Sequence, residues 1–122
     1  MKIALLGYGK MGKIIESISN DRNHNIVTKI DSISDWDIYS EEFKKADVAI
    51  EFSTPQTVVD NIFKSFEYNI PIVIGTTGWN ERFSEIAELC KAKNQTMFYA
   101  SNFSIGVNIF FEINKHLSKL MN

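Results

Sequence analysis

Ile3-Ala4-Leu5-Leu6-Gly7-Tyr8-Gly9-Lys10-Met11-Gly12 is the stretch near the start of the chain that decides the fold. Its first four residues form an apolar run of strand length, and its last six match the pattern G-x-G-x-x-G. The helix-length segment from Met11 to Ser19 follows at once. A strand, a glycine-rich turn and a helix in this order begin a strand–helix–strand unit, which is typical of parallel sheets covered by helices.

The rest of the chain repeats this alternation of short apolar runs and longer segments. We expect Ser32 to Ser40 to be a loop that precedes a short helix from Glu41 to Lys45. Thr54 is the expected N-cap of a later helix, with Pro55 at its first position. The pattern predicts an α/β fold, a Rossmann-type doubly wound parallel sheet in a single domain over residues 1–122. The other expected strands are 26–30, 48–52, 72–74 and 96–99, and the other expected helices are 55–66, 81–93 and 106–121.

Bulk composition excludes several function classes. A length of 122 residues suits one domain, and a formal net charge of -2 gives no reason to expect nucleic-acid binding. Cys90 is the only cysteine, which rules out an internal disulfide and favours a cytoplasmic location. No window has the length of a membrane span, so we expect no membrane partner. His24 and His116 lack partners at nucleophile or metal spacing, and we expect neither a catalytic residue nor a metal site in this chain.

The glycine-rich turn predicts a dinucleotide site. Gly7 permits the tight turn, Gly9 lets the backbone approach a pyrophosphate, and Gly12 lets the helix pack closely. The free N–H groups at the helix start then face the phosphate, and the Lys10 side chain adds a cation at the rim. The alternative is a tight turn that holds no ligand.

Asp31 follows the second predicted strand, where dinucleotide-binding folds place an acidic residue on the adenine ribose. The alternative is an aspartate that only caps local backbone. A carboxylate at this place repels a 2′-phosphate, and the next residue, Ser32, brings no compensating cation. We therefore expect the cofactor to be NADH or NADPH, with NADH favoured or equal.

Three further strand ends are rich in small, hydroxyl and amide residues. Because a ligand lies across the carboxyl ends of the strands in a doubly wound sheet, we expect these segments to share one site with the glycine-rich turn. Gly75 and Gly78 allow a close backbone approach, Asn102 offers an amide for a carboxamide, and Phe103 offers an apolar face. The candidate cofactor-binding residues after these strands are Phe52, Ser53, Thr54, Gly75, Thr76, Thr77, Ala100, Ser101, Asn102 and Phe103.

Four motifs together resemble the N-terminal cofactor-binding domain of 4-hydroxy-tetrahydrodipicolinate reductase, also called dihydrodipicolinate reductase. They occur in family order and span nearly the whole chain. The segments after the fourth and fifth strands are more specific than the glycine-rich turn. The motifs are Gly7-Tyr8-Gly9-Lys10-Met11-Gly12, Glu51-Phe52-Ser53-Thr54-Pro55, Gly75-Thr76-Thr77-Gly78 and Ser101-Asn102-Phe103-Ser104-Ile105-Gly106-Val107-Asn108.

The resemblance implies an oxidoreductase that uses NADH or NADPH to deliver a hydride to a cyclic substrate in lysine and diaminopimelate biosynthesis. By similarity, the backbone around Gly9, Lys10 and Met11 holds the pyrophosphate, and Asp31 holds the adenine ribose. Residues 75–77 line the nicotinamide ribose, and residues 100–103 hold the nicotinamide end. Many members have an arginine where this chain has Ser32, which again favours NADH.

In this family a second domain follows and binds the small-molecule substrate, and its paired-histidine motif is absent from these 122 residues. We therefore expect a longer enzyme, a homo-oligomer (a tetramer by resemblance), and no turnover by this part alone. Two alternatives are a stand-alone nicotinamide-nucleotide sensor or regulatory module, and the cofactor domain of another dehydrogenase acting on amino-acid imines.

Overall fold

A computed structural model describes residues 1–122. Strands and helices alternate along the chain, as the sequence predicts. The strands are β1 (Lys2–Leu6), β2 (Asn25–Ile30), β3 (Val48–Glu51), β4 (Ile72–Ile74) and β5 (Met97–Tyr99). The helices are α1 (Lys10–Asp21), α2 (Asp35–Phe43), α3 (Val58–Glu67), the short 3₁₀ helix η1 (Asn80–Arg82), α4 (Phe83–Ala92) and α5 (Ile105–Met121).

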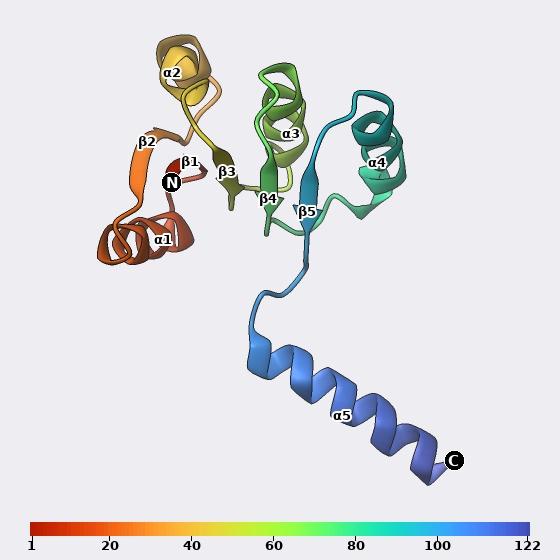
Figure 1. Cartoon of the computed structure of the whole chain (residues 1–122). Coiled ribbons are helices and arrows are strands. Elements are labelled where there is room, and N and C mark those ends of the chain that lie inside the picture. The colour runs from red at the N-terminus through yellow and green to blue at the C-terminus, as the bar shows by residue number, and fades with distance from the viewer.

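The five strands form one parallel sheet in the order β2-β1-β3-β4-β5. The chain steps from β1 outward to β2 and then returns past β1 to β3, so the strand order reverses between β1 and β3. In open α/β sheets ligands bind beyond the carboxyl ends of the strands at such a reversal. The prediction of a doubly wound parallel sheet is confirmed (Figure 1).

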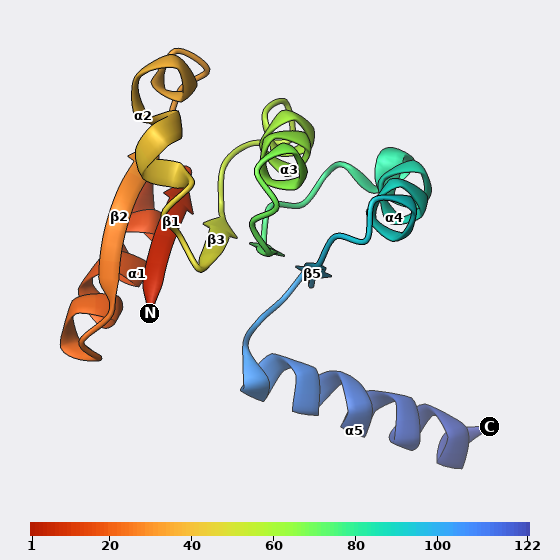
Figure 2. The same ribbon diagram turned by 45° about the horizontal axis from the view of Figure 1, so that its top comes forward.

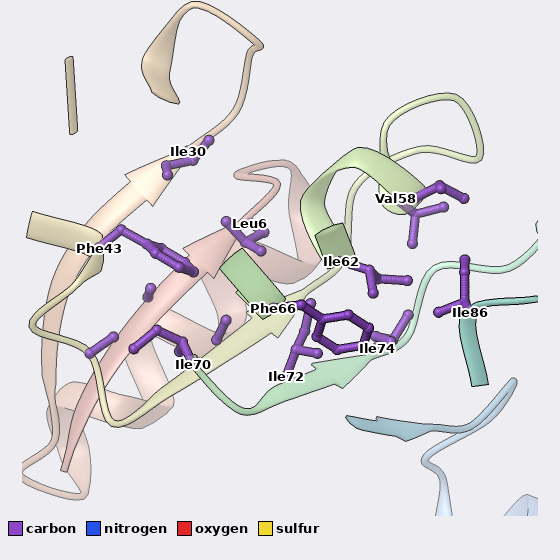
Figure 3. Packing of buried hydrophobic residues seen from close by; sticks show 14 of the residues in the cluster. Leu6, Ile30, Phe43, Val58, Ile62, Phe66, Ile70, Ile72, Ile74 and Ile86 are labelled. Atoms are coloured by element: carbon purple, nitrogen blue, oxygen red, sulfur yellow. The ribbon is translucent and has the colours of Figure 1, made fainter. Parts of the chain in front are cut away.

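The hydrophobic core lies between the sheet and the helices α2, α3 and α4, which cover one face, while α1 covers part of the other (Figures 1 and 2). Helix α3 is apolar on its sheet-facing side, where Val58, Ile62 and Phe66 recur at helical spacing. These side chains belong to the same buried cluster as Ile72 and Ile74 of β4 (Figure 3). The core therefore fixes α3 across the middle of the sheet, beside the point where the strand order reverses.

The expected loop at 32–40 and the expected short helix at 41–45 are both wrong, because helix α2 spans parts of both segments. The helix runs from Asp35 to Phe43. Trp36 and Phe43 are seven residues apart, so they share one face, and both are buried with ring centroids 4.8 Å apart. The remaining residues of the helix are mostly polar, and they conceal this narrow apolar stripe in the sequence.

The start of α3 also differs from the expectation. The helix begins at Val58, and residues 55–57 form a turn before it, so Thr54 is not its N-cap. The Thr54 hydroxyl lies 3.0 Å from the Thr57 hydroxyl, while the Thr54 carbonyl accepts from the Val58 N–H at 3.0 Å. Thr54 therefore contributes its backbone rather than its side chain to the helix start.

Helix α5 projects away from the sheet (Figures 1 and 2). It contains no buried residue, although several of its side chains are large and apolar. The Ser104 hydroxyl accepts from the Val107 N–H at 3.3 Å and caps its first turn. None of the helices combines the length and the hydropathy that a membrane span needs.

Candidate functional site

The parallel sheet brings all the sequence-predicted site segments to one edge. Each follows the carboxyl end of a strand, and backbone hydrogen bonds join neighbouring segments. The Gly7 N–H donates to Ile30 O at 2.7 Å, the Phe52 N–H to Leu6 O at 2.8 Å, and the Gly75 N–H to Glu51 O at 2.9 Å. The prediction that the motifs share one edge is confirmed.

The glycine-rich turn has the geometry that its glycines predict. Gly7 has a φ of +89°, a conformation that side chains disfavour, and a Cβ there would lie 2.6 Å from the Phe52 carbonyl carbon. A Cβ on Gly12 would lie 2.5 Å from Gly7 O, so α1 packs directly on the turn. A Cβ on Gly9 would meet nothing within 4 Å. The backbone at Gly9 thus faces open space in front of the N-terminus of α1, where Lys10 and Met11 are exposed.

Asp31 lies beside this turn, and its Oδ1 accepts from the Tyr8 N–H at 2.6 Å. One carboxylate oxygen of Asp31 therefore caps backbone, as the alternative interpretation proposed, and this bond does not involve the other oxygen. Lys29 points elsewhere, because its Nζ lies 2.7 Å from a Glu16 carboxylate oxygen and 4.5 Å from the centroid of the Tyr8 ring. Hydrogen bonds from Lys29 and Tyr8 hold the pKa of Glu16 below its usual range. The lysine nearest to Asp31 along the chain is thus engaged by another carboxylate.

The segments after β3 and β4 are tied together. The Ser53 N–H donates to the Thr76 hydroxyl at 2.7 Å, and the Thr76 side chain is buried. A Cβ on Gly75 would lie 2.8 Å from Cδ1 of Phe52 and closer still to two other ring atoms. The absence of a side chain at Gly75 therefore makes room for the Phe52 ring of the protein itself. Thr54 and Thr77 are exposed beside this junction.

The segment after β5 completes the edge. Phe103 lies next to Phe52, with ring centroids 6.1 Å apart, and is 42% exposed, which leaves an apolar face open. The Asn102 side-chain oxygen accepts from the Ser104 N–H at 2.8 Å. This bond occupies the oxygen of the amide and leaves its NH₂ group for another acceptor. Ala100 is half-buried and Ser101 is exposed.

A pocket of about 540 Å³ opens between α2 and α3. Of the predicted site residues, Asp31 and Ser53 line it. Its charged lining holds four carboxylates against one cation, Lys64, whose Nζ lies 3.1 Å from a Glu67 oxygen. The four carboxylates are those of Asp31, Asp37, Asp60 and Glu67.

Glu51, Asn61 and Trp36 form a buried polar network at this pocket, which Asn61 and Trp36 line, and we did not predict it from the sequence. The Asn61 amide donates to Glu51 Oε1 at 3.2 Å and accepts from the Trp36 indole N–H at 3.2 Å. Ser53 donates its hydroxyl proton to the same Glu51 oxygen, while Glu51 Oε2 is buried without a partner. The network joins α2, β3 and α3 to the loop that carries Ser53. An apolar stripe through Trp36 and Phe43 was the one signal in the sequence for its α2 component.

Trp79 and Cys90 occupy structural positions. Trp79 is 4% exposed and donates its indole N–H to Thr76 O at 2.8 Å, and Cys90 is buried in the core. His24 precedes β2 and so lies at the opposite edge of the sheet, and His116 is exposed on α5. Neither histidine lies with the site segments.

Comparison with known proteins supplies the family. Residues 1–103 match the family model described as dihydrodipicolinate reductase, N-terminus. This chain belongs to the dihydrodipicolinate reductase family. The match covers every predicted site segment, from the glycine-rich turn to Phe103. The part of the family that it matches is the nicotinamide-dinucleotide-binding domain.

Individual members of the dihydrodipicolinate reductase family agree. A protein of Christiangramia forsetii named 4-hydroxy-tetrahydrodipicolinate reductase is 48% identical over 122 residues, covering 99% of this chain and 50% of the relative. Relatives with the same name from Rickettsia bellii and Staphylococcus epidermidis are 34% and 35% identical over 93% of this chain. The chain spans about half the length of the curated relatives it matches.

A solved structure supports the fold. The dipicolinate-bound dihydrodipicolinate reductase from Paenisporosarcina sp. TG-14 matches with a TM-score of 0.69 at 22% identity, covering 87% of this chain and 49% of that one. The resemblance inferred from the four sequence motifs is confirmed by the family model and by the relatives.

Proposed function

We propose that this chain is the cofactor-binding half of a 4-hydroxy-tetrahydrodipicolinate reductase and binds NADH at the carboxyl edge of its sheet. The observation that carries the proposal is the contact between the glycine-rich turn and Asp31, whose Oδ1 accepts from Tyr8 N at 2.6 Å. A phosphate-binding turn and a ribose-binding carboxylate are thereby side by side at the reversal of strand order. The names of the relatives favour this proposal over a stand-alone sensor module.

The residues present fit the parts of a dinucleotide. The open space at Gly9 and the first N–H groups of α1 suit the pyrophosphate. The free oxygen of Asp31 suits an adenine ribose hydroxyl, and the exposed Phe103 ring suits the nicotinamide. When bound, the cofactor supplies the hydride. The chain's own groups bind and orient it, and the second domain expected for the whole enzyme supplies the substrate site and the proton donor.

The charges around Asp31 support a preference for NADH. A 2′-phosphate brings about two negative charges toward the Asp31 carboxylate, and the one lysine that lines the adjacent pocket, Lys64, is paired with Glu67. Lys29 is paired with Glu16. Repulsion between like charges in a partly exposed site amounts to about 1 kcal/mol, and we expect an affinity ratio of about tenfold or less.

Titration of the chain with NADH and NADPH at low salt tests the proposal. NADH should bind, and Asp31→Ala should weaken it. Asp31→Asn separates the two tasks of the side chain, because the amide oxygen still accepts from Tyr8 N–H. Asp21→Ala, at the far end of α1, is the matched control. Absence of NADH binding to the unaltered chain, or equal binding by Asp31→Ala, refutes the assignment.

A catalytic assay gives a second test. No histidine lies at the site edge, so the chain alone should show no substrate-dependent oxidation of NADH. Turnover that depends on the cyclic substrate would reveal a proton donor among these 122 residues.

A further inference from the structure

The side chain of Asp35, the first residue of α2, folds back onto the turn between β2 and α2. Its Oδ2 accepts from two consecutive backbone N–H groups, those of Asp31 and Ser32, each at 2.8 Å. These two bonds hold the pKa of Asp35 below its usual range, so the side chain is a carboxylate at neutral pH. An anion of the protein itself therefore occupies this pair of donors.

The place of this pair in the fold gives it a functional meaning. Consecutive backbone N–H groups that point at one atom form an anion-binding nest. In dinucleotide-binding folds the residue at the end of the second strand receives the adenine ribose, and the groups beside it receive the 2′-phosphate when NADP is bound. The nest formed by Asp31 and Ser32 is thus a place where a 2′-phosphate oxygen would find hydrogen-bond donors.

We propose that Asp35 is a specificity-determining residue, whose carboxylate takes the place of a 2′-phosphate at the β2–α2 turn and so disfavours NADPH. The inference rests on the proposed function, because it requires Asp31 to face the adenine ribose. NADH needs no donor from the nest and binds through the free oxygen of Asp31. NADPH has to displace the Asp35 carboxylate or leave its phosphate without these N–H groups.

One of the two bonds of Asp35 is that of a capping box, because the Ser32 N–H, three residues earlier, donates to it, and the Asp35 N–H lies 3.2 Å from Ser32 O. Ser34, the residue before α2, makes no side-chain bond to the helix N-terminus, and its hydroxyl lies 2.9 Å from that of Ser32. The second bond, from the Asp31 N–H four residues earlier, goes beyond such a cap and reaches the end of β2. A residue that only stabilised this turn would affect the binding of both cofactors equally.

Four proteins test the proposal: the unaltered chain, Asp35→Asn, Asp35→Ala and the control Asp37→Asn. Asn keeps an oxygen acceptor for the nest but removes the charge, whereas Ala removes both. Asp37→Asn makes the same change of charge in the same helical turn, on a residue that lines the adjacent pocket. The dissociation constants of NADH and NADPH are measured for each at low salt.

Relative to NADH, NADPH should gain about tenfold in affinity on Asp35→Ala, about threefold on Asp35→Asn, and less than about twofold on Asp37→Asn. Equal effects on both cofactors, or a gain on Asp37→Asn that matches Asp35→Ala, would overturn the proposal. Should Asp35→Ala unfold, the comparison of Asp35→Asn with Asp37→Asn decides. Failure of the unaltered chain to bind NADH refutes the proposed function instead, and this inference with it.

Discussion

Alanine at Gly7 should destabilise the fold, whereas alanine at Gly9 should spare the fold and weaken cofactor binding. At Gly7 the φ of +89° is unfavourable for any residue with a Cβ, which costs about 1–3 kcal/mol. The new Cβ would also lie 2.6 Å from the Phe52 carbonyl carbon and 2.8 Å from the Ser53 Cα. Backbone must move to relieve this overlap, at a further cost of about 1–3 kcal/mol.

The sum for Gly7→Ala is a loss of about 2–6 kcal/mol, a large part of the roughly 5–15 kcal/mol that stabilises a domain. Gly9 differs, because its φ is -80° and a Cβ there meets nothing within 4 Å. We expect Gly9→Ala to change the free energy of unfolding by less than about 1 kcal/mol. Its methyl group should fill the space where a pyrophosphate approaches the backbone and raise the dissociation constant of NADH about tenfold or more.

Urea unfolding followed by circular dichroism measures the first effect, and titration with NADH measures the second. Gly9→Ala should change only the NADH titration, so its unfolding curve is the control for the stability loss of Gly7→Ala. Unchanged stability of Gly7→Ala would refute the geometry of the turn. Unchanged NADH affinity of Gly9→Ala would refute the placement of the pyrophosphate.

Three further predictions concern the polar network at the pocket, helix α5 and Asp35. Asn61→Leu should lower the free energy of unfolding by about 2–4 kcal/mol, because it removes a buried partner of both Glu51 and Trp36. The control Ser65→Ala removes a hydrogen bond within α3 and should lower the free energy of unfolding by less than about 1.5 kcal/mol in the same urea experiment. A chain that ends at Ser104 should keep its free energy of unfolding within about 1 kcal/mol, because α5 buries no residue, and a larger loss in thermal or urea unfolding would mean that α5 docks on the sheet. The pKa of Asp35 is lowered from 3.8 in the fold, so its contribution to stability is present above pH 3.8 and is lost as the pH falls through the folded value. Asp35→Asn should therefore show a shallower loss of stability in acid than the unaltered chain, and identical pH profiles would contradict the bonds to Asp31 and Ser32.

The sequence predicted the sheet and its edge because both depend on local signals. Short apolar runs separated by helix-length segments determine a parallel sheet, and parallel strands necessarily gather their carboxyl ends at one edge. The positive φ of Gly7 and the close packing at Gly12 are likewise local properties of a strand–turn–helix unit. These features follow from residue type and spacing alone.

Helix α2 and the polar network were not predictable in the same way. The segment from Ser32 to Ser40 is mostly polar. The two buried aromatic residues of the helix, Trp36 and Phe43, both contact Tyr68, which follows α3 and is distant in sequence. Asn61 and Glu51 are ten positions apart, and only the packing of α3 on β3 brings their side chains together. Such contacts depend on tertiary structure, which spacing within one element cannot encode.

The unpredicted helix links the core to the proposed site. Trp36 is buried, stacks on Tyr68 with ring centroids 6.4 Å apart, and donates to Asn61, so the hydrophobic core fixes the position of α2. Asp35 precedes Trp36 directly, and its carboxylate is therefore held at the β2–α2 turn before any ligand arrives. Because the Asp35 carboxylate is already fixed, it can exclude a competing anion without rearrangement and without further loss of side-chain entropy. The packing of one tryptophan thus determines where the charge that we assign to cofactor discrimination lies.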